Sequence, residues 1–321
     1  MFFSFVIPVY NRPDEIQELL ESLSQQSYKN FEVIVVEDGS QKDCKEIALN
    51  FRDRLNLKYF YKKNQGQGVA RNYGFSKARG DYLITLDSDV VVPDLYLEKV
   101  FQGIKRGGLD AFGGPDASHE AFSPLQKAIN YSMTSVFTTG GIRGGKKHVG
   151  RFDPRGFNMG ISREVYHQTG GFLFHRRSED IELSIRIYAL GFKIGLIPEA
   201  WVYHKRRSTL LQFMKQTLSF GKGRIDIFRE HPKELKLVHL LPSIFTVSLL
   251  FLFALNFISY GPASILSDIG NSLLLLYIAL LFVHALVKEK NIYIASLAVF
   301  TSIIQLTAYG LGLLLAAVKS T

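Results

Sequence analysis

The sequence is poor in cysteine, since Cys44 stands alone among 321 residues, and this excludes a disulfide within the chain. The lack of disulfides fits a reducing compartment. Acidic residues are outnumbered, with 29 Asp and Glu against 38 Lys and Arg. Charge of either sign is nearly missing from residues 238–318, which hold only Asp268, Lys288, Glu289 and Lys290. This change in composition predicts a boundary between an enzyme-like N-terminal part and an apolar C-terminal part.

Three long apolar runs fill the C-terminal part, at residues 239–258, 265–287 and 292–318. A run of about 20 apolar residues is long enough to span the hydrocarbon core of a bilayer as a helix. The alternative is a set of buried helices in a soluble core, which would need a much larger protein around them. We therefore expect residues 238–321 to form a membrane domain with about three transmembrane helices.

Basic residues flank these runs unevenly. Lys and Arg are frequent between residues 205 and 236, the short segment 259–264 has none, and Lys288 and Lys290 precede the third run. By the positive-inside rule we expect an inner (plasma) membrane protein with a cytoplasmic N-terminal domain and its C-terminus outside. The basic stretch could contact nucleic acid or anionic lipid, and its place beside the apolar runs favours membrane lipids.

Two further segments have a biased composition. Residues 208–237 interleave apolar side chains with Lys215, Lys222 and Arg224, which predicts an amphipathic helix at the membrane interface; a simple amphipathic connector is the alternative. Residues 140–150 are rich in Gly and Lys, which predicts a mobile loop.

The N-terminal part alternates strand and helix patterns. Residues 2–9 are too short for a signal peptide and lack a preceding basic segment, so we expect a buried strand there. Further strands are predicted at residues 31–36, 57–61 and 81–86, and helices from Pro13 and over residues 43–53 and 67–78. This alternation predicts an α/β fold with a mainly parallel sheet that helices cover on both faces.

Polar residues follow three of these strands, at the sheet edge where ligands of such folds bind. They are Tyr10, Asn11, Glu37, Asp38, Asp87, Ser88 and Asp89. Two carboxylates as close as Asp87 and Asp89 repel each other unless a positive group lies beside them. A Mg²⁺ or Mn²⁺ ion bound to a diphosphate meets that need. The alternative is a polar turn without a ligand.

A second acidic pair opens a predicted helix. Ser178 is expected to cap the helix over residues 181–191, where Glu179 and Asp180 would be favoured by the helix dipole alone. A carboxylate at that place could instead take a proton from an incoming hydroxyl group, if a metal–diphosphate site lies opposite. His204 follows a short predicted strand and is either a structural histidine or a metal ligand that joins Asp89.

Taken together, these motifs resemble the family 2 glycosyltransferases of the GT-A fold. Motifs at residues 7–11, 35–40, 68–74, 87–89 and 179–180 appear in the order of that family, with Arg186 and Gly191 beyond the last. The resemblance covers about residues 3–205, so we expect a catalytic domain at residues 1–207. One departure is Glu37, where the family usually has aspartate.

The resemblance implies roles for the residues that match these motifs. Pro8, Tyr10 and Asn11 would line the nucleotide pocket, Asp38 would hydrogen-bond the base, and Arg71 would approach the nucleoside or the diphosphate.

The same resemblance implies the metal site. Asp87 would face the ribose or the metal, with Ser88 beside it in the donor site. Asp89 and His204 would bind the metal.

The resemblance also implies a reaction, a single displacement that inverts the anomeric carbon of the sugar. Asp180 would be the catalytic base and Glu179 would support it, while the metal and Arg71 neutralise charge on the leaving diphosphate. A base favours a hydroxyl group of a glycan or lipid-linked glycan as acceptor, in cell-surface polysaccharide synthesis, with a UDP-sugar as donor. A polyprenyl-phosphate glycosyltransferase and a catalytically idle membrane scaffold are the alternatives.

Overall fold

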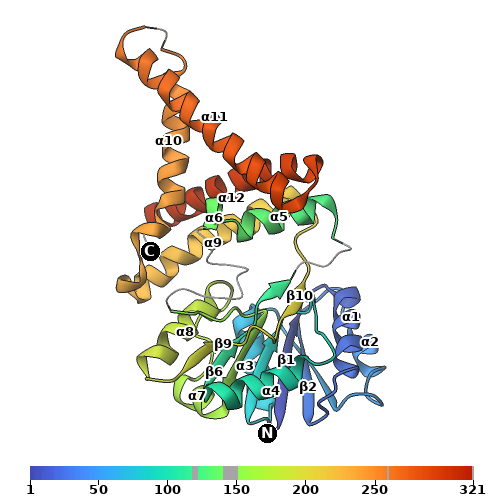
Figure 1. The fold of residues 1–321 in the computed structure, drawn as a ribbon. Coiled ribbons are helices and arrows are strands. Elements are labelled where there is room, and N and C mark those ends of the chain that lie inside the picture. Colours follow the sequence, from blue (N-terminus) through green and yellow to red (C-terminus); the bar gives the residue numbers. More distant parts are fainter. Residues whose placement is uncertain (118–121, 140–150, 259, 320–321) are drawn as a thin grey trace. The chain divides into compact units, whose positions relative to one another are not determined.

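The computed structural model describes residues 1–117, 122–139, 151–258 and 260–319 (Figure 1). The predicted loop at residues 140–150 lies outside these described residues. The chain divides into two compact units, Met1–His119 with Gly145–Lys205, and Glu120–Gly144 with Arg206–Thr321. Residues 120–144 thus group with the second unit, and the predicted catalytic domain at residues 1–207 stays a prediction.

A seven-stranded sheet forms the centre of the first unit, in the order β3-β2-β1-β4-β8-β6-β9 (Figure 1). Its strands are β1 (Phe3–Val9), β2 (Phe31–Asp38), β3 (Leu57–Lys62), β4 (Tyr82–Leu86), β6 (Ala111–Gly113), β8 (Asn158–Ser162) and β9 (Ile194–Leu196). Strands β1 to β4 pair in parallel, whereas β8 runs antiparallel to both β4 and β6. The mainly parallel sheet that the alternating pattern predicts is confirmed.

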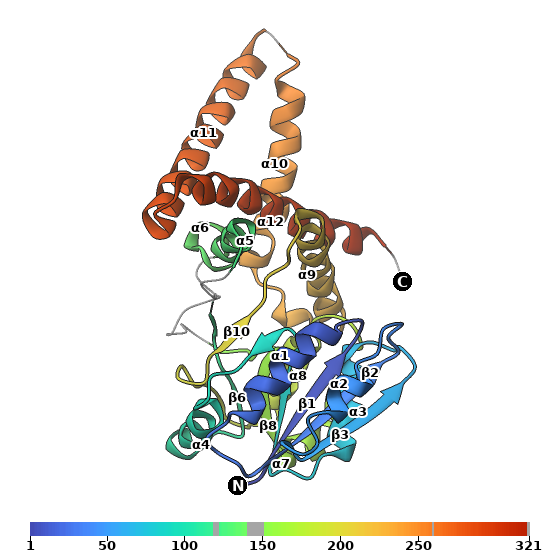
Figure 2. The same ribbon diagram turned by 90° about the vertical axis from the view of Figure 1, so that its right-hand side faces the viewer.

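Helices cover both faces of this sheet. They are α1 (Pro13–Ser24), α2 (Lys45–Leu49), α3 (Gln67–Lys77), α4 (Tyr96–Gly107), α7 (Arg163–Thr169) and α8 (Glu179–Ala189). Successive side chains of a strand point to opposite faces. Phe5 and Ile7 of β1 accordingly pack with α1, α2 and α4, and Val6 packs with α3, α7 and α8. Figure 2 shows α1 and α2 in front of the sheet.

The strand predictions agree with β1 to β4 within two residues at each end, but the helix predicted over residues 43–53 is too long. Helix α2 ends at Leu49, and the chain continues in turns. There the N–H group of Phe51 bonds the carbonyl of Ala48, three residues back. Phe51 is still buried, so its apolar side chain marked a packing position and not a helical one.

A small sheet lies beside the carboxyl end of β4. It consists of β5 (Val90–Val91), β10 (Val202–His204) and β7 (Asp116–Ala117), in the order β5-β10-β7. His204 is paired with Val90, the residue after Asp89. The N–H group of Lys205 also donates to the carbonyl of Asp89 at 3.1 Å. This pairing brings a histidine from the end of the first unit to the end of β4.

The second unit is helical. Its helices are α5 (Pro124–Thr134), α6 (Val136–Thr139), α9 (Leu210–Glu230), α10 (Leu241–Leu255), α11 (Pro262–Glu289) and α12 (Ile292–Val318), with short 3₁₀ turns at Pro232–Glu234 and Leu237–His239. Helix α12 packs on α5 and α9. Tyr131 of α5 lies in a buried cluster with residues of α11 and α12, such as Leu281 and Ala298. This packing explains why α5 belongs to the second unit.

Two helices of this unit, α11 and α12, are long and apolar enough to cross a membrane, by length and composition. The first predicted run, at residues 239–258, holds only the 15-residue helix α10. A helix of that length measures about 22 Å, which is short of a hydrocarbon core of about 30 Å. Pro242 lies in the first turn of α10, and the preceding residues form the 3₁₀ turn.

Candidate active site

The ends of β1 and β2 are tied together by Asn11. Its backbone lies in the left-handed region, with a φ of 53°, and its N–H group donates to Ser40 Oγ at 2.6 Å. Asn11 Oδ1 accepts the N–H group of Gln41 at 2.8 Å. Asn11 therefore shapes the edge of the predicted nucleotide pocket. Tyr10 beside it is exposed and Pro8 is half-buried, so each keeps some surface for a ligand.

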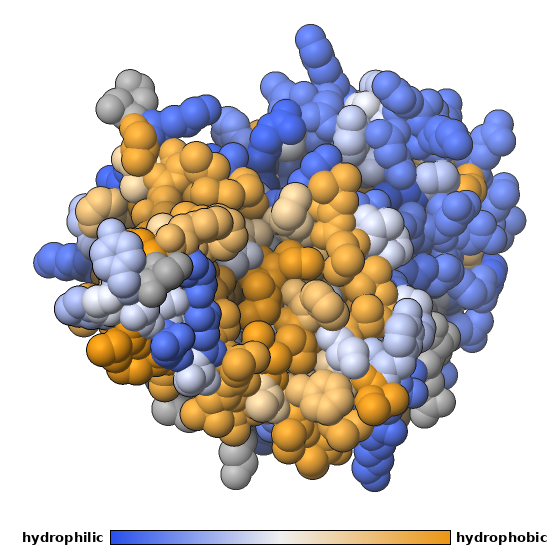
Figure 3. All heavy atoms as spheres, turned by 90° about the horizontal axis from the view of Figure 1, so that it is seen from above, coloured by the Kyte–Doolittle hydropathy of each residue, from blue (hydrophilic) through white to orange (hydrophobic). Residues whose placement is uncertain are grey.

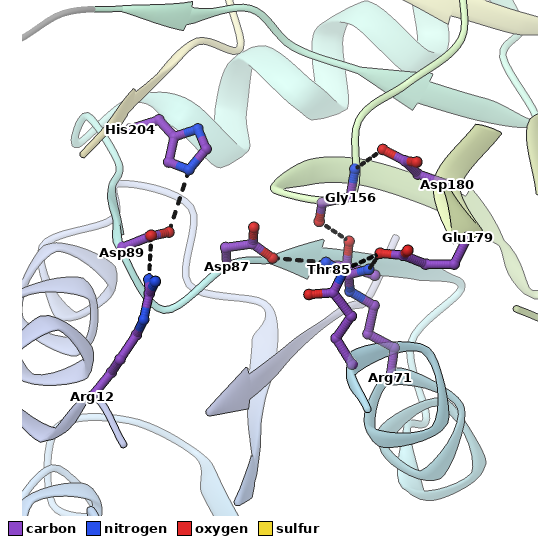
Figure 4. A network of polar contacts seen from close by, with 10 residues as sticks. Arg12, Arg71, Thr85, Asp87, Asp89, Gly156, Glu179, Asp180 and His204 are labelled. Carbon is purple, nitrogen blue, oxygen red and sulfur yellow. Dashed lines mark hydrogen bonds and ion pairs between the residues drawn. The ribbon is translucent and has the colours of Figure 1, made fainter. Parts of the chain in front are cut away.

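Asp87, Asp89 and His204 form a cluster whose ligand atoms lie within 4.8 Å of one another (Figure 4). His204 Nε2 lies 3.4 Å from Asp89 Oδ1. The imidazole packs against the ring of Phe157, with the ring centres 4.5 Å apart. His204 Nδ1 is buried and has no hydrogen-bond partner among the described residues.

This donor set fits a divalent cation. Two carboxylates and one imidazole suit Mn²⁺, and carboxylates suit Mg²⁺. The structure brings together the three residues that the sequence analysis assigned to the metal, from β4 and β10. Asp87 and Asp89 are too far from His204 in the sequence for spacing alone to join them.

Arg12 also reaches this cluster, and sequence reasoning missed it. Its guanidinium forms an ion pair with Asp89 Oδ2 (Figure 4). Burial alone would raise the pKa of Asp89, but His204 and Arg12 outweigh it and hold this pKa below its ordinary value. Asp89 therefore lies between the Arg12 guanidinium and the His204 imidazole. The sequence feature that could have identified Arg12 is its position directly after Tyr10 and Asn11, the polar residues that follow β1.

Arg71 links the two acidic motifs, because it bonds a carboxylate of each. It is fully buried, and its guanidinium donates to Asp87 Oδ1 at 2.7 Å and to Glu179 Oε1 at 2.6 Å. The guanidinium also lies 5.3 Å from the ring centre of Phe172. Both terminal nitrogens of the guanidinium thus bond protein carboxylates, so Arg71 acts on Asp87 and Glu179 directly. The predicted contact of Arg71 with the nucleotide stays a prediction.

Glu179 is the buried member of the second acidic pair. Burial raises its pKa most strongly, Asp180 adds to the rise, and the charge of Arg71 opposes it, which leaves the pKa above the ordinary value. Gln67 also donates to Glu179 Oε1. These contacts fix the first turn of α8, and with it the backbone of Asp180.

Asp180 is half-buried and points to the loop before β8. Its Oδ2 accepts the N–H group of Gly156 at 3.0 Å, and the carbonyl of Gly156 accepts Thr85 Oγ1 at 2.5 Å. Thr85 lies on β4, two residues before Asp87, so the second acidic motif meets the end of β4 (Figure 4). Ser178 stands at the N-cap of α8 as predicted, with a φ of 56°, but its side chain makes no capping hydrogen bond among the described residues.

Asp38 and Glu37 shape the loops around the pocket. Asp38 is buried, and its oxygens accept Lys62 Nζ at 2.6 Å and the N–H group of Gly66 at 2.9 Å. Its predicted bond to a base stays a prediction. Glu37 is fully buried and accepts the N–H group of Cys44 at 2.8 Å. Glutamate at this position thus closes the turn after β2.

Residues 4–170, more than half of the chain, match the family described as Glycosyl transferase family 2. The chain belongs to glycosyltransferase family 2. A protein from Rickettsia felis called an uncharacterized glycosyltransferase is 43% identical over 139 residues, which are 43% of this chain and 22% of that protein. This chain therefore spans less than a quarter of that relative.

Other family 2 relatives match over more of their length. The glycosyltransferase GlyG of Streptococcus pneumoniae is 26% identical over 235 residues, which are 70% of this chain and 77% of that protein. The succinoglycan biosynthesis protein ExoA of Rhizobium meliloti is 26% identical over 231 residues, which are 70% of each chain.

Solved structures show that this family 2 chain has the GT-A fold. Mannosyltransferase PcManGT of Pyrobaculum calidifontis, in complex with GDP-Man and Mn²⁺, aligns with a TM-score of 0.64 at 16% identity and covers 95% of this chain and 86% of that one. TarS 1–349 of S. aureus, in complex with UDP-GlcNAc, aligns with a TM-score of 0.51 at 18% identity and covers 95% of this chain and 90% of that one.

Within this family 2 domain, the predicted residues fall into two groups. Asp87, Asp89, His204, Glu179 and Asp180 lie in one contact network, which Figure 4 shows from β4 to α8. A second group lies around the ends of β1 and β2, and it comprises Pro8, Tyr10, Asn11 and Asp38. Ser88 stands between Asp87 and Asp89 in the sequence, and its side chain is buried. The donor-binding roles of this second group and of Ser88 stay predictions.

Proposed function

We propose that this chain is a metal-dependent, inverting glycosyltransferase. It would move a sugar from a nucleotide-diphosphate sugar to a hydroxyl group of a glycan or of a lipid-linked glycan. The observation that carries the proposal is the network in which Arg71 joins Asp87 of the metal cluster to Glu179, the neighbour of Asp180. One site then holds a cation-binding group and a candidate base.

In the proposed reaction, the acceptor oxygen forms a bond to the anomeric carbon while the bond from this carbon to the diphosphate breaks. Asp180 accepts the proton of the acceptor hydroxyl, and Gly156 holds one oxygen of its carboxylate in place. Asp87, Asp89 and His204 would hold Mg²⁺ or Mn²⁺, which stabilises the charge on the leaving diphosphate when bound. Arg71 keeps Asp87 in position at the metal site, and its charge opposes the rise in the pKa of Glu179 that burial causes beside the base.

The donor class is supported by the neighbours of the same fold, whose names include GDP-Man and UDP-GlcNAc. We favour a UDP-sugar. The relative ExoA, named for succinoglycan biosynthesis, supports a role in polysaccharide synthesis. The apolar helices α11 and α12 support attachment to the plasma membrane, and the basic residues that precede α10 support a cytoplasmic catalytic unit.

Replacement of the base tests the reaction. We expect Asp180→Asn to lower sugar transfer by about a hundred- to ten-thousand-fold, the usual contribution of acid–base catalysis. Donor binding should stay within about twofold, because Asn keeps the bond from Gly156. Binding is measured as the Mn²⁺-dependent shift in melting temperature across a panel of UDP- and GDP-sugars.

The matched control is Asp53→Asn, because Asp53 is exposed in a turn that precedes β3, whereas the site residues follow the carboxyl ends of strands. It should change neither readout. An equal loss of binding and transfer in Asp180→Asn would assign Asp180 a structural role. Transfer to a polyprenyl phosphate, with none to a glycan, would favour the polyprenyl-phosphate enzyme instead.

A further inference from the structure

Helix α12 is packed backbone to backbone against α9. A Cβ atom on Gly221 of α9 would lie 2.0 Å from the carbonyl oxygen of Tyr309, and one on Gly312 would lie 2.1 Å from that of Leu218. Near the ends of both helices, Arg229 donates to the carbonyl of Ala316 at 3.0 Å. The C-terminal half of α12 therefore lies along α9 (Figure 1).

Helix α9 is too charged to enter the hydrocarbon core of a bilayer. Along the stretch that contacts α12 it carries Lys215, Lys222, Arg224, Asp226 and Arg229. Ionised side chains inside a membrane are costly and are rare there. Because α12 lies against α9 along this stretch, the depths of the two helices can differ by no more than about 10 Å, the distance between packed helices. A transmembrane α12 would pull these charges into the core.

The N-terminal half of α12 lies on α5, another helix with polar ends. Thr301 Oγ1 donates to the carbonyl of Ala128 at 3.0 Å, and Ala298 packs against Tyr131. Helix α5 begins with a capping box made by Ser123 and Gln126. Both halves of α12 thus rest on helices that suit a water-facing layer.

The α10–α11 hairpin differs from α12 in what covers its apolar surface. In its most apolar window, α11 is 11% buried, whereas α12 is 50% buried. Figure 3 shows apolar side chains over the face that carries these helices, and large exposed ones on α10 and α11 include Leu250, Phe253, Leu273, Leu275 and Leu276. Protein thus already buries half of this window of α12, whereas the exposed apolar surface of α11 needs an apolar partner.

The α10–α11 hairpin contacts α12 through the start of α10 and the end of α11. Gly310 of α12 packs on the carbonyl of Pro242 at the start of α10, and Ala295 packs on Leu281 and Ala285 near the end of α11. These contacts lie 15 residues apart on α12, about 22 Å along the helix. Helix α12 therefore lies across the base of the hairpin in both ribbon views (Figures 1 and 2).

We propose that the α10–α11 hairpin enters the bilayer and returns, while α12 lies along the membrane surface on α5 and α9. Residue 319 then ends on the same side of the membrane as residue 205. This arrangement replaces the three spans and the outside C-terminus that the sequence predicts. The inference rests on the proposed membrane attachment and is independent of the sugar-transfer reaction.

Cysteine labelling in sealed vesicles tests this topology. Three single variants place a thiol on exposed residues of the catalytic unit, the hairpin tip and the end of α12, namely Asp53→Cys, Tyr260→Cys and Lys319→Cys. Unmodified protein is the blank, because Cys44 is buried and burial raises the pKa of its thiol. A membrane-impermeant maleimide is the probe, and Val318→Cys repeats the measurement at the end of α12.

In vesicles where Asp53→Cys is labelled, we expect Lys319→Cys and Val318→Cys to label to the same extent. Tyr260→Cys should label only after detergent opens the vesicles. If Val318→Cys and Lys319→Cys were labelled only after detergent, as Tyr260→Cys is expected to be, the proposal would be overturned. Labelling of Tyr260→Cys in the intact vesicles, or release of the protein by alkaline carbonate, would also overturn it.

Sugar transfer is assayed in the same vesicles. A failure of transfer with the expected labelling pattern counts against the proposed reaction alone. The reverse result, transfer with the three-span labelling pattern, counts against the topology alone.

Discussion

Arg71 shows how one side chain can serve both stability and the site. Its fully buried guanidinium neutralises Glu179, which is itself buried, and it holds Asp87 at the edge of the metal cluster. The close approach of Gly156 leaves no room around the guanidinium, because a Cβ atom there would lie 2.8 Å from its nitrogens. Arg71 is therefore a positioning residue for two carboxylates in one site.

Removal of this charge should destabilise the first unit. Arg71→Met leaves Glu179 buried without its cation, and loss of one partner of a buried ion pair costs about 3–5 kcal/mol of unfolding free energy. Adding Glu179→Gln removes the unpaired charge, so the double variant should recover part of the loss. Melting temperatures of the variants measure this, with the exposed Arg52→Met as control. A double variant less stable than Arg71→Met would contradict the assignment.

Glu32 offers a pH-dependent test of the same kind, away from the site. Its carboxylate is fully buried and accepts Ser4 Oγ at 2.9 Å, the N–H group of Arg79 at 2.7 Å and Lys58 Nζ at 2.9 Å. Burial raises the pKa of Glu32, but these donors outweigh it and lower the pKa. The stabilisation is thus present above the unfolded pKa of about 4.3 and is lost as the pH falls through the folded value.

Glu32→Gln should therefore lower the melting temperature at pH 7, because the amide NH₂ cannot accept from Lys58. We expect a cost of about 1–3 kcal/mol, and a smaller difference from the unmodified protein below pH 4. The measurement is the difference in melting temperature between the two proteins at several pH values. A constant difference from pH 3 to pH 7 would contradict the lowered pKa.

At the residue level, sequence motifs predicted the acidic residues of the site but not the groups that neutralise them. Asp87, Asp89 and Asp180 were found because they follow strands or open a helix in an ordered set of motifs. Arg12 was missed, because its ion pair with Asp89 depends on the adjacency of β1 and β4. The role of Arg71 between two carboxylates was missed for the same reason.

At the scale of elements, strands of the buried sheet were the most predictable. Apolar runs gave β1, β2 and β4 because these strands are buried on both faces. The sequence could not predict that α5 belongs to the second unit, because its partners on α11 and α12 lie about 150 residues away in the chain. The predicted first run was longer than α10, because the hydropathy of the residues does not show where the 3₁₀ turn before Pro242 ends and the helix begins.

The close contact of α9 and α12 predicts a large effect of one methyl group. Alanine is normally favoured over glycine inside a helix, by about 1 kcal/mol. In Gly221→Ala the new methyl group would meet the carbonyl of Tyr309 at 2.0 Å, and backbone cannot move aside easily. Overpacking of this kind costs about 1–3 kcal/mol, so we expect a net loss of stability in the second unit.

Thermal unfolding in detergent and protease cleavage within α9 measure this loss. The control is Leu211→Ala, on an exposed position of the same helix. If Gly221→Ala raised the melting temperature instead, α9 and α12 would have to be further apart than the structure gives, and the surface placement of α12 would lose its main support.

At the scale of the whole molecule, the chain leaves the first unit and returns to it. Residues 120–144 belong to the second unit, although they lie between strands of the first. Helix α5 contributes Ile129, Tyr131 and Met133 to buried clusters with α9, α11 and α12. The first unit is therefore not a segment that one cut can separate.

This organisation predicts the outcome of truncation. A chain that ends at Lys205 keeps α5 but loses every helix that covers its apolar face. Exposure of a buried Ile, Met or Tyr side chain loses about 1.5–3 kcal/mol of transfer free energy each, so this chain should aggregate. Removal of residues 122–139 as well, with a Gly/Ser linker in their place, should give a soluble first unit, because loop closure depends only weakly on length. Soluble yield and circular dichroism of the two truncated chains decide the matter. Equal solubility of both would mean that α5 needs no cover from the second unit, and the two-unit division would then fail.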